Sequence, residues 1–223
     1  MEERKESKKF HIIQIDVAKE LTHGMCVSNM AYRVGKKLSL SEEMCYNLAV
    51  AGLLHDIGKL EMAKYVTTDR KKKGNTLRVE EMRYVRTHPA LSYAILKERG
   101  YQEEIVEWVL YHHENYDGSG YPANRAGEEI PLGARILRVC DVFAALTTNR
   151  PYRKAFDVKT AVELMIAEVK NFDMQVFLAF LQVVNAGDIE TVLDHQALSV
   201  QDLMGLEEFQ YLRKIEDEQE ERE

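Results

Sequence analysis

Apolar residues recur at steps of three and four positions along nearly the whole chain, which is the period of helices that bury one face. The first such run covers residues 17–38. Ser41 is then expected to be the N-cap of the next helix, because Glu42 and Glu43 follow it in the first turn, where the helix dipole favours acidic side chains. The same period predicts helices over residues 41–54, 79–97, 103–112, 131–148, 157–170 and 173–185. No segment alternates long enough to predict a central sheet, so the pattern indicates an all-α fold.

Two stretches break the helical period. Residues 61–77 have weak periodicity and a basic run, and residues 114–130 are rich in Asp-Gly and Ser-Gly turn pairs. Both are expected to be largely loops. Pro89 is expected to kink or restart its helix, and Pro131 suits the first turn of the helix that follows.

Composition changes at both ends of the chain. Residues 1–10 form a charged N-terminal segment, residues 11–185 the predicted helical domain, and residues 186–223 an appended segment. The acidic tail over residues 207–223 carries −5 of the formal net charge of −7, which leaves −2 for the rest. The body is therefore nearly balanced, and its charge does not exclude an anionic substrate. Whether the appended segment extends the helices or binds a partner stays open.

The apolar content, the cysteines and the basic run indicate where the protein acts and which partners it lacks. Apolar residues make up 45% of the chain, yet no run approaches the roughly 20 apolar residues of a membrane span. The charged N-terminus does not look like a secretory signal, and the three cysteines (Cys26, Cys45 and Cys140) are odd in number and not closely paired. We therefore expect a cytoplasmic protein. The one basic run, residues 70–73, comes without a recognition motif, so no DNA or RNA partner is expected.

Histidines beside other metal-ligand residues are the main chemical signal. Five of the seven histidines fall at predicted helix ends or inward positions, among them the pairs His55-Asp56 and His112-His113. A single histidine on an apolar face is usually a core residue, but burying several imidazoles and carboxylates together is costly unless a metal compensates. Asp56 has two oxygens and can bridge two cations. Lys59 adds a positive charge that could meet a phosphate.

These motifs, taken in order, resemble a known family. The chain is similar to the HD superfamily of phosphohydrolases and, within it, to the HD-GYP group of cyclic di-GMP phosphodiesterases. The resemblance spans roughly residues 22–184. It is carried by His23, His55-Asp56-Ile57-Gly58-Lys59, His88-Pro89, His112-His113-Glu114-Asn115-Tyr116-Asp117-Gly118-Ser119-Gly120-Tyr121-Pro122, Ile130-Pro131, Ala134-Arg135-Ile136, Asp141-Val142-Phe143, Ala145-Leu146-Thr147, Arg150-Pro151-Tyr152-Arg153 and Phe172-Asp173.

The resemblance implies an all-α HD-domain helical bundle around a centre of two divalent metal ions. By position, one metal would be held by His23, His55, Asp56 and Asp141. Asp56 would bridge to a second metal held by His88, His112 and His113. The resemblance favours iron or manganese, and ligands of this type also suit zinc or nickel.

The same resemblance assigns the reaction and the substrate contacts. Asp56 and Lys59 would be catalytic, and the substrate would be bound by Gly118, Gly120, Tyr121, Arg150 and Arg153. The expected activity is hydrolysis of cyclic di-GMP to linear pGpG, and whether the product is cleaved further to GMP is left open. Hydrolysis of cyclic GMP-AMP or another nucleotide, or a non-catalytic cyclic di-GMP sensor, are the alternatives. A homodimer or a regulatory protein partner is left open.

Three positions depart from the family pattern. Some members have a glutamate four residues before the first histidine, where this chain has Lys19; Glu20 is one residue off, about 100° around the helix, so we expect two metals rather than three. Ala144 replaces an aspartate that usually follows the last metal ligand by three residues. The connector over residues 60–77 also differs, and Met174 replaces a proline.

Overall fold

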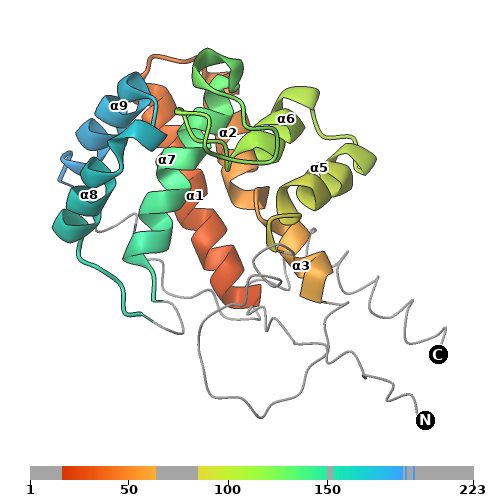
Figure 1. Cartoon of the computed structure of the whole chain (residues 1–223), viewed down its shortest axis with the longest axis horizontal. Coiled ribbons are helices and arrows are strands. Elements are labelled where there is room, and N and C mark those ends of the chain that lie inside the picture. The colour runs from red at the N-terminus through yellow and green to blue at the C-terminus, as the bar shows by residue number, and fades with distance from the viewer. Residues whose placement is uncertain (1–16, 64–84, 150–152, 188, 190–192, 194–223) are drawn as a thin grey trace, which may run out of the picture.

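The computed structural model describes residues 17–63, 85–149, 153–187, 189 and 193. Within these ranges the regular structure is helical and contains no strand, so the predicted all-α fold is confirmed (Figure 1). The helices are α1 (Val17–Lys37), α2 (Glu42–Leu54), α3 (Ile57–Ala63), α5 (His88–Glu98), α6 (Glu103–Tyr111), α7 (Leu132–Thr147), α8 (Val158–Ala167) and α9 (Met174–Val184). Two short 3-10 turns cover Gly127–Glu129 and Val169–Asn171.

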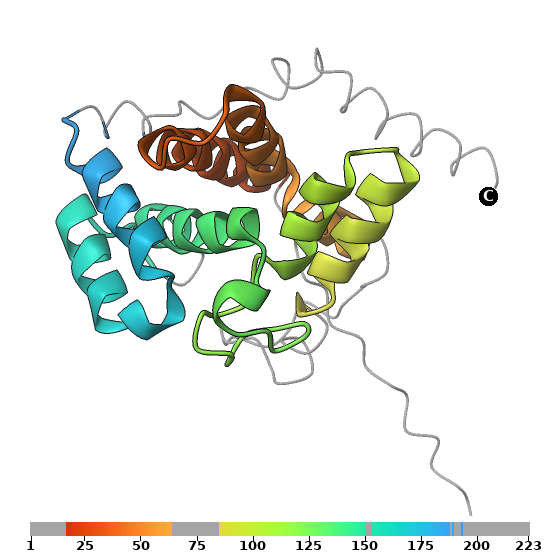
Figure 2. The same cartoon turned by 90° about the horizontal axis from the view of Figure 1, so that it is seen from above.

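Helices α1 and α7 form the centre of the bundle. Helix α1 packs against α2, α7 and α9, and α7 also packs against α6, α8 and α9. Figure 2 shows the paired α5 and α6 on one side of this centre and α8 with α9 on the other. The His55 end of α2 and the His113 end of α6 lie near Asp141 of α7.

The core lies between the central helices and their neighbours. Its largest fully buried side chains include Phe143 of α7, Phe180 of α9 and Met30 of α1. Trp108, 3% exposed, packs its indole against Gly133, where a Cβ atom would lie 2.1 Å from the ring. Trp108 is thus a packing residue that lets α6 approach α7 closely. Within the described residues, no helix has both the length and the apolar character to cross a membrane.

Most of the predicted elements are found, with differences at their ends. The Oγ of Ser41 accepts a hydrogen bond from the Met44 amide at 3.2 Å, as expected of an N-cap. Pro89 does restart a helix, since α5 begins at His88. Pro131 is the N-cap of α7 rather than part of its first turn. Helix α3 was not predicted, because a seven-residue helix with Gly58 inside it gives too short a periodic signal.

Several predictions lie wholly or mostly outside the described residues. These are the segment 1–10, most of the connector 60–77 with its basic run, Arg150, and most of the segment 186–223. The division into three segments therefore stays a prediction.

Candidate metal centre

His55 and Asp56 occupy the turn between α2 and α3. His55 is the C-cap of α2, and α3 starts at the next residue after Asp56. Gly58 presses α3 against α5: a Cβ there would lie 2.5 Å from the His88 carbonyl oxygen, and the Gly58 amide donates to Ser92 Oγ at 2.9 Å. This close packing brings Asp56 beside His88. The glycine of the His-Asp motif thus allows an approach that a larger residue would prevent.

The first group of ligand-type side chains joins three helices. His23 comes from α1, His55 from the end of α2, and Asp141 from α7. His23 Nε2 lies 3.0 Å from Asp141 Oδ1, and His55 Nε2 lies 3.8 Å from the same oxygen. One atom of each residue falls within 4.8 Å of the others, which is close enough for a shared cation.

The second group gathers around the start of α5 and the end of α6. His88 Nε2 lies 3.1 Å from His113 Nε2 and 3.4 Å from His112 Nε2. Asp56 completes this group, with Oδ1 at 3.0 Å from His88 Nε2.

Asp56 also links the two groups. Its Oδ2 lies 3.2 Å from His55 Nε2 and 3.8 Å from His23 Nε2, whereas its Oδ1 faces His88. Each carboxylate oxygen therefore points at a different set of imidazoles. This is the arrangement expected of a bridging ligand.

Backbone carbonyls orient three of the imidazole rings. The Nδ1 atoms of His55, His88 and His112 lie 2.7, 2.7 and 2.6 Å from the carbonyl oxygens of Gly52, Val85 and Val109, each three residues earlier. Donation from Nδ1 leaves Nε2 as a lone pair that points inward, which is the tautomer that a metal requires.

Several buried side chains of the two groups have pKa values far from their usual ones. Burial lowers the pKa of His113 to about 3 and the pKa of His112 well below its usual value, so both rings stay neutral. Burial also lowers the pKa of His55, but the carboxylates of Asp56 and Asp141 outweigh it and raise that pKa to about 10. The pKa of Asp56 is held well below its usual value against the effect of burial, chiefly by His55 and Lys59.

Close contacts do not satisfy all of these polar atoms. His55 Nε2 and Asp56 Oδ1 are buried and have no hydrogen-bond partner among the described residues, although each lies near an oppositely charged or polar group. Buried polar atoms without a hydrogen-bond partner are costly, and a cation that replaces the proton of His55 and binds Asp56 would remove that cost. The donor set of imidazoles and carboxylates is therefore suited to metal binding.

Lys59 lies at the edge of this centre. Its Nζ is 2.5 Å from Asp56 Oδ2 and 3.6 Å from Glu20 Oε2. Burial disfavours the charged ammonium, but the two carboxylates outweigh that effect and raise the pKa of Lys59. The sequence reasoning set Glu20 aside because of its register on the helix. The structure brings its carboxylate to Lys59, although α1 and α3 are far apart in the sequence.

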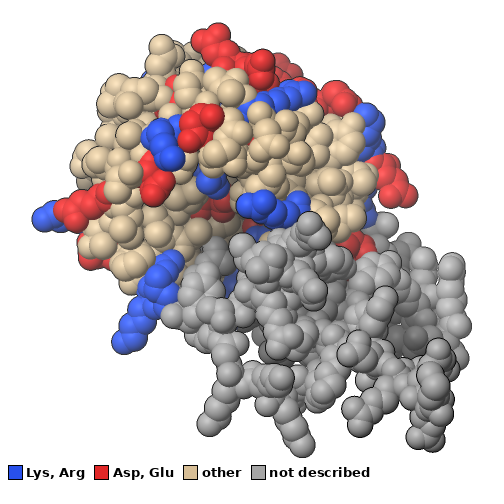
Figure 3. Space-filling view, viewed as in Figure 1, with Lys and Arg blue, Asp and Glu red and all other residues tan. Residues whose placement is uncertain are grey.

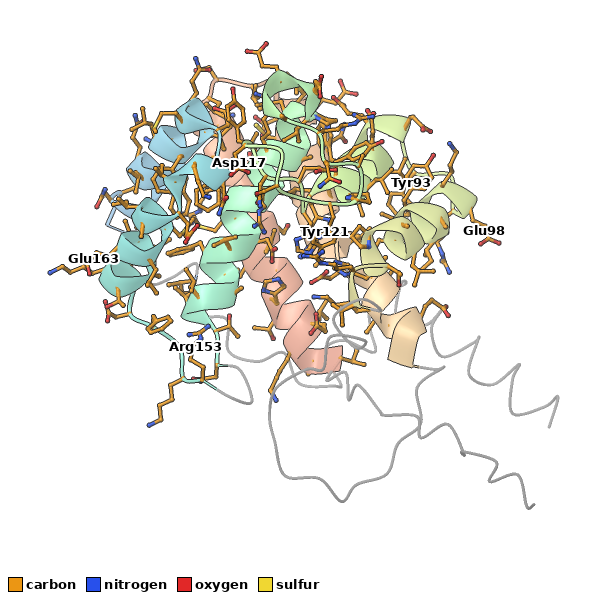
Figure 4. The ribbon with its side chains drawn as sticks, viewed as in Figure 1. Tyr93, Glu98, Asp117, Tyr121, Arg153 and Glu163 are labelled. Carbon is orange, nitrogen blue, oxygen red and sulfur yellow. The ribbon has the colours of Figure 1, made fainter. Side chains whose placement is uncertain are left out.

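The Gly-Tyr-Pro loop, residues 114–130, lies against the second group through Tyr121. The ring of Tyr121 stacks on His113 with centroids 4.8 Å apart, and the Arg86 guanidinium lies 4.9 Å from the Tyr121 centroid. Burial raises the pKa of the Tyr121 hydroxyl. Figure 4 shows Tyr121 beside the nitrogen-rich side chains at the centre of the molecule.

The two predicted glycines act differently in this loop. Gly118 adopts φ +82°, a conformation that favours glycine. Gly120 has no positive φ, but a Cβ there would lie 2.2 Å from the Asn115 amide nitrogen. Both glycines shape the loop, and their contact with a substrate stays a prediction.

Arg153 has its hydrogen bonds at the end of α7. Its two terminal nitrogens donate to the carbonyls of Ala145 at 2.8 Å, Leu146 at 3.0 Å and Lys154 at 2.7 Å, and its guanidinium lies over Phe156. Figure 4 labels it at the C-terminal end of α7. Its predicted contact with substrate therefore stays a prediction.

The late Phe-Asp motif has a structural role that the sequence did not indicate. Asp173 caps α9 by accepting hydrogen bonds from the amides of Gln175 and Val176, and it pairs with Arg135 Nη1 at 2.5 Å. Ala144 is fully buried in the core. A carboxylate at position 144 would therefore meet apolar neighbours in this chain.

The comparisons with known proteins agree with this geometry. An HD-domain family model matches residues 5–176. "Cyclic di-GMP phosphodiesterase PA4108" of Pseudomonas aeruginosa is 34% identical over 78% of this chain and 42% of its own. The response regulator RpfG of Xanthomonas campestris, also named a cyclic di-GMP phosphodiesterase, is 38% identical over 64% of this chain and 37% of its own. The "3'3'-cGAMP-specific phosphodiesterase 1" of Vibrio cholerae is 35% identical over 73% of this chain and 38% of its own.

The solved structures support the same fold. A cyclic GMP-AMP-specific phosphodiesterase of Vibrio cholerae, V-cGAP3, superimposes with a TM-score of 0.62 at 20% identity, over 83% of this chain and 50% of the other. Bd1817 of Bdellovibrio bacteriovorus gives a TM-score of 0.61 at 17% identity, over 77% and 54%. This chain thus spans about two fifths of the length of the curated relatives it matches. The chain belongs to the HD-domain family, and its His-Asp and Gly-Tyr-Pro motifs fit the HD-GYP group within it.

Proposed function

We propose that this chain is a metal-dependent phosphodiesterase that hydrolyses cyclic di-GMP to linear pGpG and onward to GMP. The observation that carries the proposal is Asp56, whose two oxygens face two separate groups of imidazoles. Two adjacent metal ions are a common solution for phosphoester hydrolysis. Relatives named as cyclic di-GMP phosphodiesterases support this choice of substrate.

The proposed ligands follow the two groups. His23, His55 and Asp141 would hold one ion, His88, His112 and His113 the other, and Asp56 both. When bound, such ions act as Lewis acids that polarise the phosphoryl group and activate water. Iron or manganese is the proposed metal, and zinc or nickel also suits these ligands.

The chain's own residues complete the site. Asp56 would fix the spacing between the two groups, and the ammonium of Lys59 would stabilise negative charge on the phosphoryl oxygens. Gly118, Gly120 and Tyr121 would shape the pocket for the base and phosphate. Arg150 lies outside the described residues, and Arg153 would have to exchange carbonyl contacts for phosphate contacts.

Cyclic GMP-AMP is the second candidate substrate. Two of the relatives that are more than 30% identical to this chain are named 3'3'-cGAMP-specific phosphodiesterases. A non-catalytic sensor is the third candidate. The complete set of ligand-type side chains gives this third candidate less support, because a sensor would not need every one of them.

The test is turnover by the purified chain loaded anaerobically with iron(II) or manganese(II). Cyclic di-GMP and cyclic GMP-AMP are supplied separately, and products are separated by chromatography. Asp56→Asn should abolish turnover and lower the metal content, because the amide leaves one group without its anionic oxygen. Glu163→Gln, the same chemical change on the exposed surface of α8, is the control and should keep full activity. Cyclic di-GMP binding without turnover at two metals per chain would instead support the sensor.

A further inference from the structure

Arg138 is a partly buried arginine near the candidate metal centre, and the proposed reaction assigns it no role. It lies on α7 one turn before Asp141, so the two side chains share a face of the helix. Its Nε donates to the Asn115 side-chain oxygen at 2.9 Å. Among the described residues no carboxylate forms an ion pair with it, and its terminal nitrogens have no hydrogen-bond partner.

A second arginine on the same helix provides the comparison. Arg135, one turn earlier, is neutralised by Asp173 at 2.5 Å and helps to fix the start of α9. The partner of Arg138 is a neutral amide instead. Burial disfavours the charge of Arg138 and lowers its pKa, and Asp141 offsets this only in part. A partly buried cation without a paired carboxylate is disfavoured, so the surroundings of Arg138 suit an anion that arrives from outside.

The guanidinium of Arg138 lies near His113 and Tyr121, as its electrostatic effect on both groups indicates. The charge of Arg138 lowers the pKa of both His113 and Tyr121, although burial dominates each pKa. Tyr121 stacks on His113. Arg138 therefore lies close to a proposed metal ligand and to the loop that covers it. Figure 3 shows a hollow near the middle of the face seen in Figure 1, with Lys and Arg side chains at its rim.

Asn115 orients the guanidinium without neutralising it. The Asn115 amide nitrogen donates to Ser119 Oγ at 2.9 Å, and Ser119 Oγ donates to Asp117 Oδ1 at 2.5 Å. These bonds fix which end of the amide faces Arg138. Because Asn115 accepts a hydrogen bond only from Nε of Arg138, the two terminal amino groups of the guanidinium remain available as a planar pair of donors. Such a fork matches two oxygens of a phosphate.

We propose that Arg138, oriented by Asn115, binds a non-bridging oxygen pair of the substrate's phosphodiester. The proposal rests on the proposed phosphodiester chemistry of this site and adds a specific anion-binding residue to it. The same arginine would also hold the phosphate of the product or free inorganic phosphate, because the recognised group is identical.

The first experiment measures binding of inorganic phosphate to the metal-loaded chain by calorimetry. Arg138→Met should raise the Kd for phosphate by about tenfold or more, the loss expected for charge-assisted hydrogen bonds. Arg138→Lys should fall in between, since it keeps the charge but loses the fork. Asn115→Asp should also weaken binding, because the new carboxylate would neutralise Arg138. Arg135→Met is the matched control: it should lower the melting temperature and leave the Kd within twofold.

The second experiment uses steady-state kinetics with cyclic di-GMP and with bis(p-nitrophenyl) phosphate, a simple phosphodiester. For each substrate that the wild type hydrolyses, Arg138→Met should raise KM more than it lowers kcat, with unchanged metal content. If cyclic dinucleotides are not hydrolysed but phosphate affinity still depends on Arg138, the proposed function fails and this inference stands. If phosphate does not bind at millimolar concentration, or if Arg138→Met leaves its Kd unchanged, the inference is overturned whatever the substrate.

Discussion

Gly120 offers a sharp test of how the Gly-Tyr-Pro loop serves the metal centre. A Cβ at this position would lie 2.2 Å from the Asn115 nitrogen, 2.5 Å from Glu114 Cα and 2.6 Å from Glu114 carbonyl carbon. Ordinary carbon contacts are about 3.5–4.0 Å, so Gly120→Ala must open the loop by roughly 1 Å. All three atoms belong to the backbone and cannot rotate away.

The opening acts on the residues on both sides of position 120. Tyr121, the next residue, stacks on His113 and donates its amide to the His113 carbonyl at 3.2 Å. Asn115 would move away from Arg138. A misplacement of about 1 Å can cost a reaction roughly 100-fold, so kcat/KM for the cyclic dinucleotide should fall by about that factor. The overpacking cost of about 1–3 kcal/mol exceeds the ~0.4–1 kcal/mol gained by restricting the unfolded chain, so stability also falls modestly.

Gly127→Ala is the matched control on the same loop. Gly127 has φ +58° and nothing within 4 Å of its Cβ position, so alanine brings backbone strain of about 1–2 kcal/mol and no clash. Both variants should therefore lose similar stability in urea denaturation, while only Gly120→Ala loses activity. Equal kcat/KM values for the two variants would refute the argument that close packing at Gly120 positions the site.

Four further predictions follow from the contacts described above. Lys59→Met should lower kcat by about 100-fold or more with both metals retained, measured by turnover and metal analysis, since one charged donor to a phosphoryl oxygen is lost; unchanged kcat would remove Lys59 from the reaction. Asp173→Ala should destabilise the chain by about 1–2 kcal/mol through loss of the α9 cap, with activity per folded molecule unchanged, whereas Asp173→Asn should keep most of the cap and lose only the ion pair with Arg135. The metal-free chain should be most stable near pH 6.5 in denaturation series. Below pH 6.5, His112 and His113 are protonated in the unfolded chain but stay neutral in the folded one, so the free energy of unfolding falls with pH. Between pH 6.5 and about 10, His55 is protonated only in the folded chain, so the free energy of unfolding falls as the pH rises. A flat profile would contradict this. Cys26, Cys45 and Cys140 are buried, and burial raises the pKa of Cys26 to about 12, so at pH 8 none should react with a thiol reagent until denaturant is added.

Local signals carried the sequence predictions that succeeded. The period of apolar residues marked the long helices, and Ser41 marked the start of α2 because its partner is only three residues away. The pairs His55-Asp56 and His112-His113 were recognised in the same way, since they sit at helix ends, whereas the complete ligand set came from the family resemblance. The structure then brings all seven proposed ligands into two linked groups, although their role as ligands still awaits a metal-binding measurement.

Contacts between distant segments account for what the sequence reasoning missed. The position of Glu20 was judged from its register on α1 alone, yet Lys59 of α3 lies 3.6 Å from its carboxylate. The close packing of α3 on α5 at Gly58 was not predicted. A Cβ at Gly58 would lie 2.5 Å from the His88 carbonyl oxygen, so the glycine is needed for this packing. Neither contact has a signature within a short window of sequence.

The different roles of the two arginines of α7 could not be predicted from the sequence. Arg135 and Arg138 are one turn apart on the same helix, and by pattern alone both would be assigned to the same kind of surface. Their partners differ. Arg135 pairs with the carboxylate that caps α9, whereas Arg138 donates to the amide of Asn115 in the Gly-Tyr-Pro loop. A charged partner makes an arginine part of the scaffold, whereas a neutral one orients it and leaves its charge for a ligand. For a site that acts on anions, the arginine without a counter-ion is therefore the one to test.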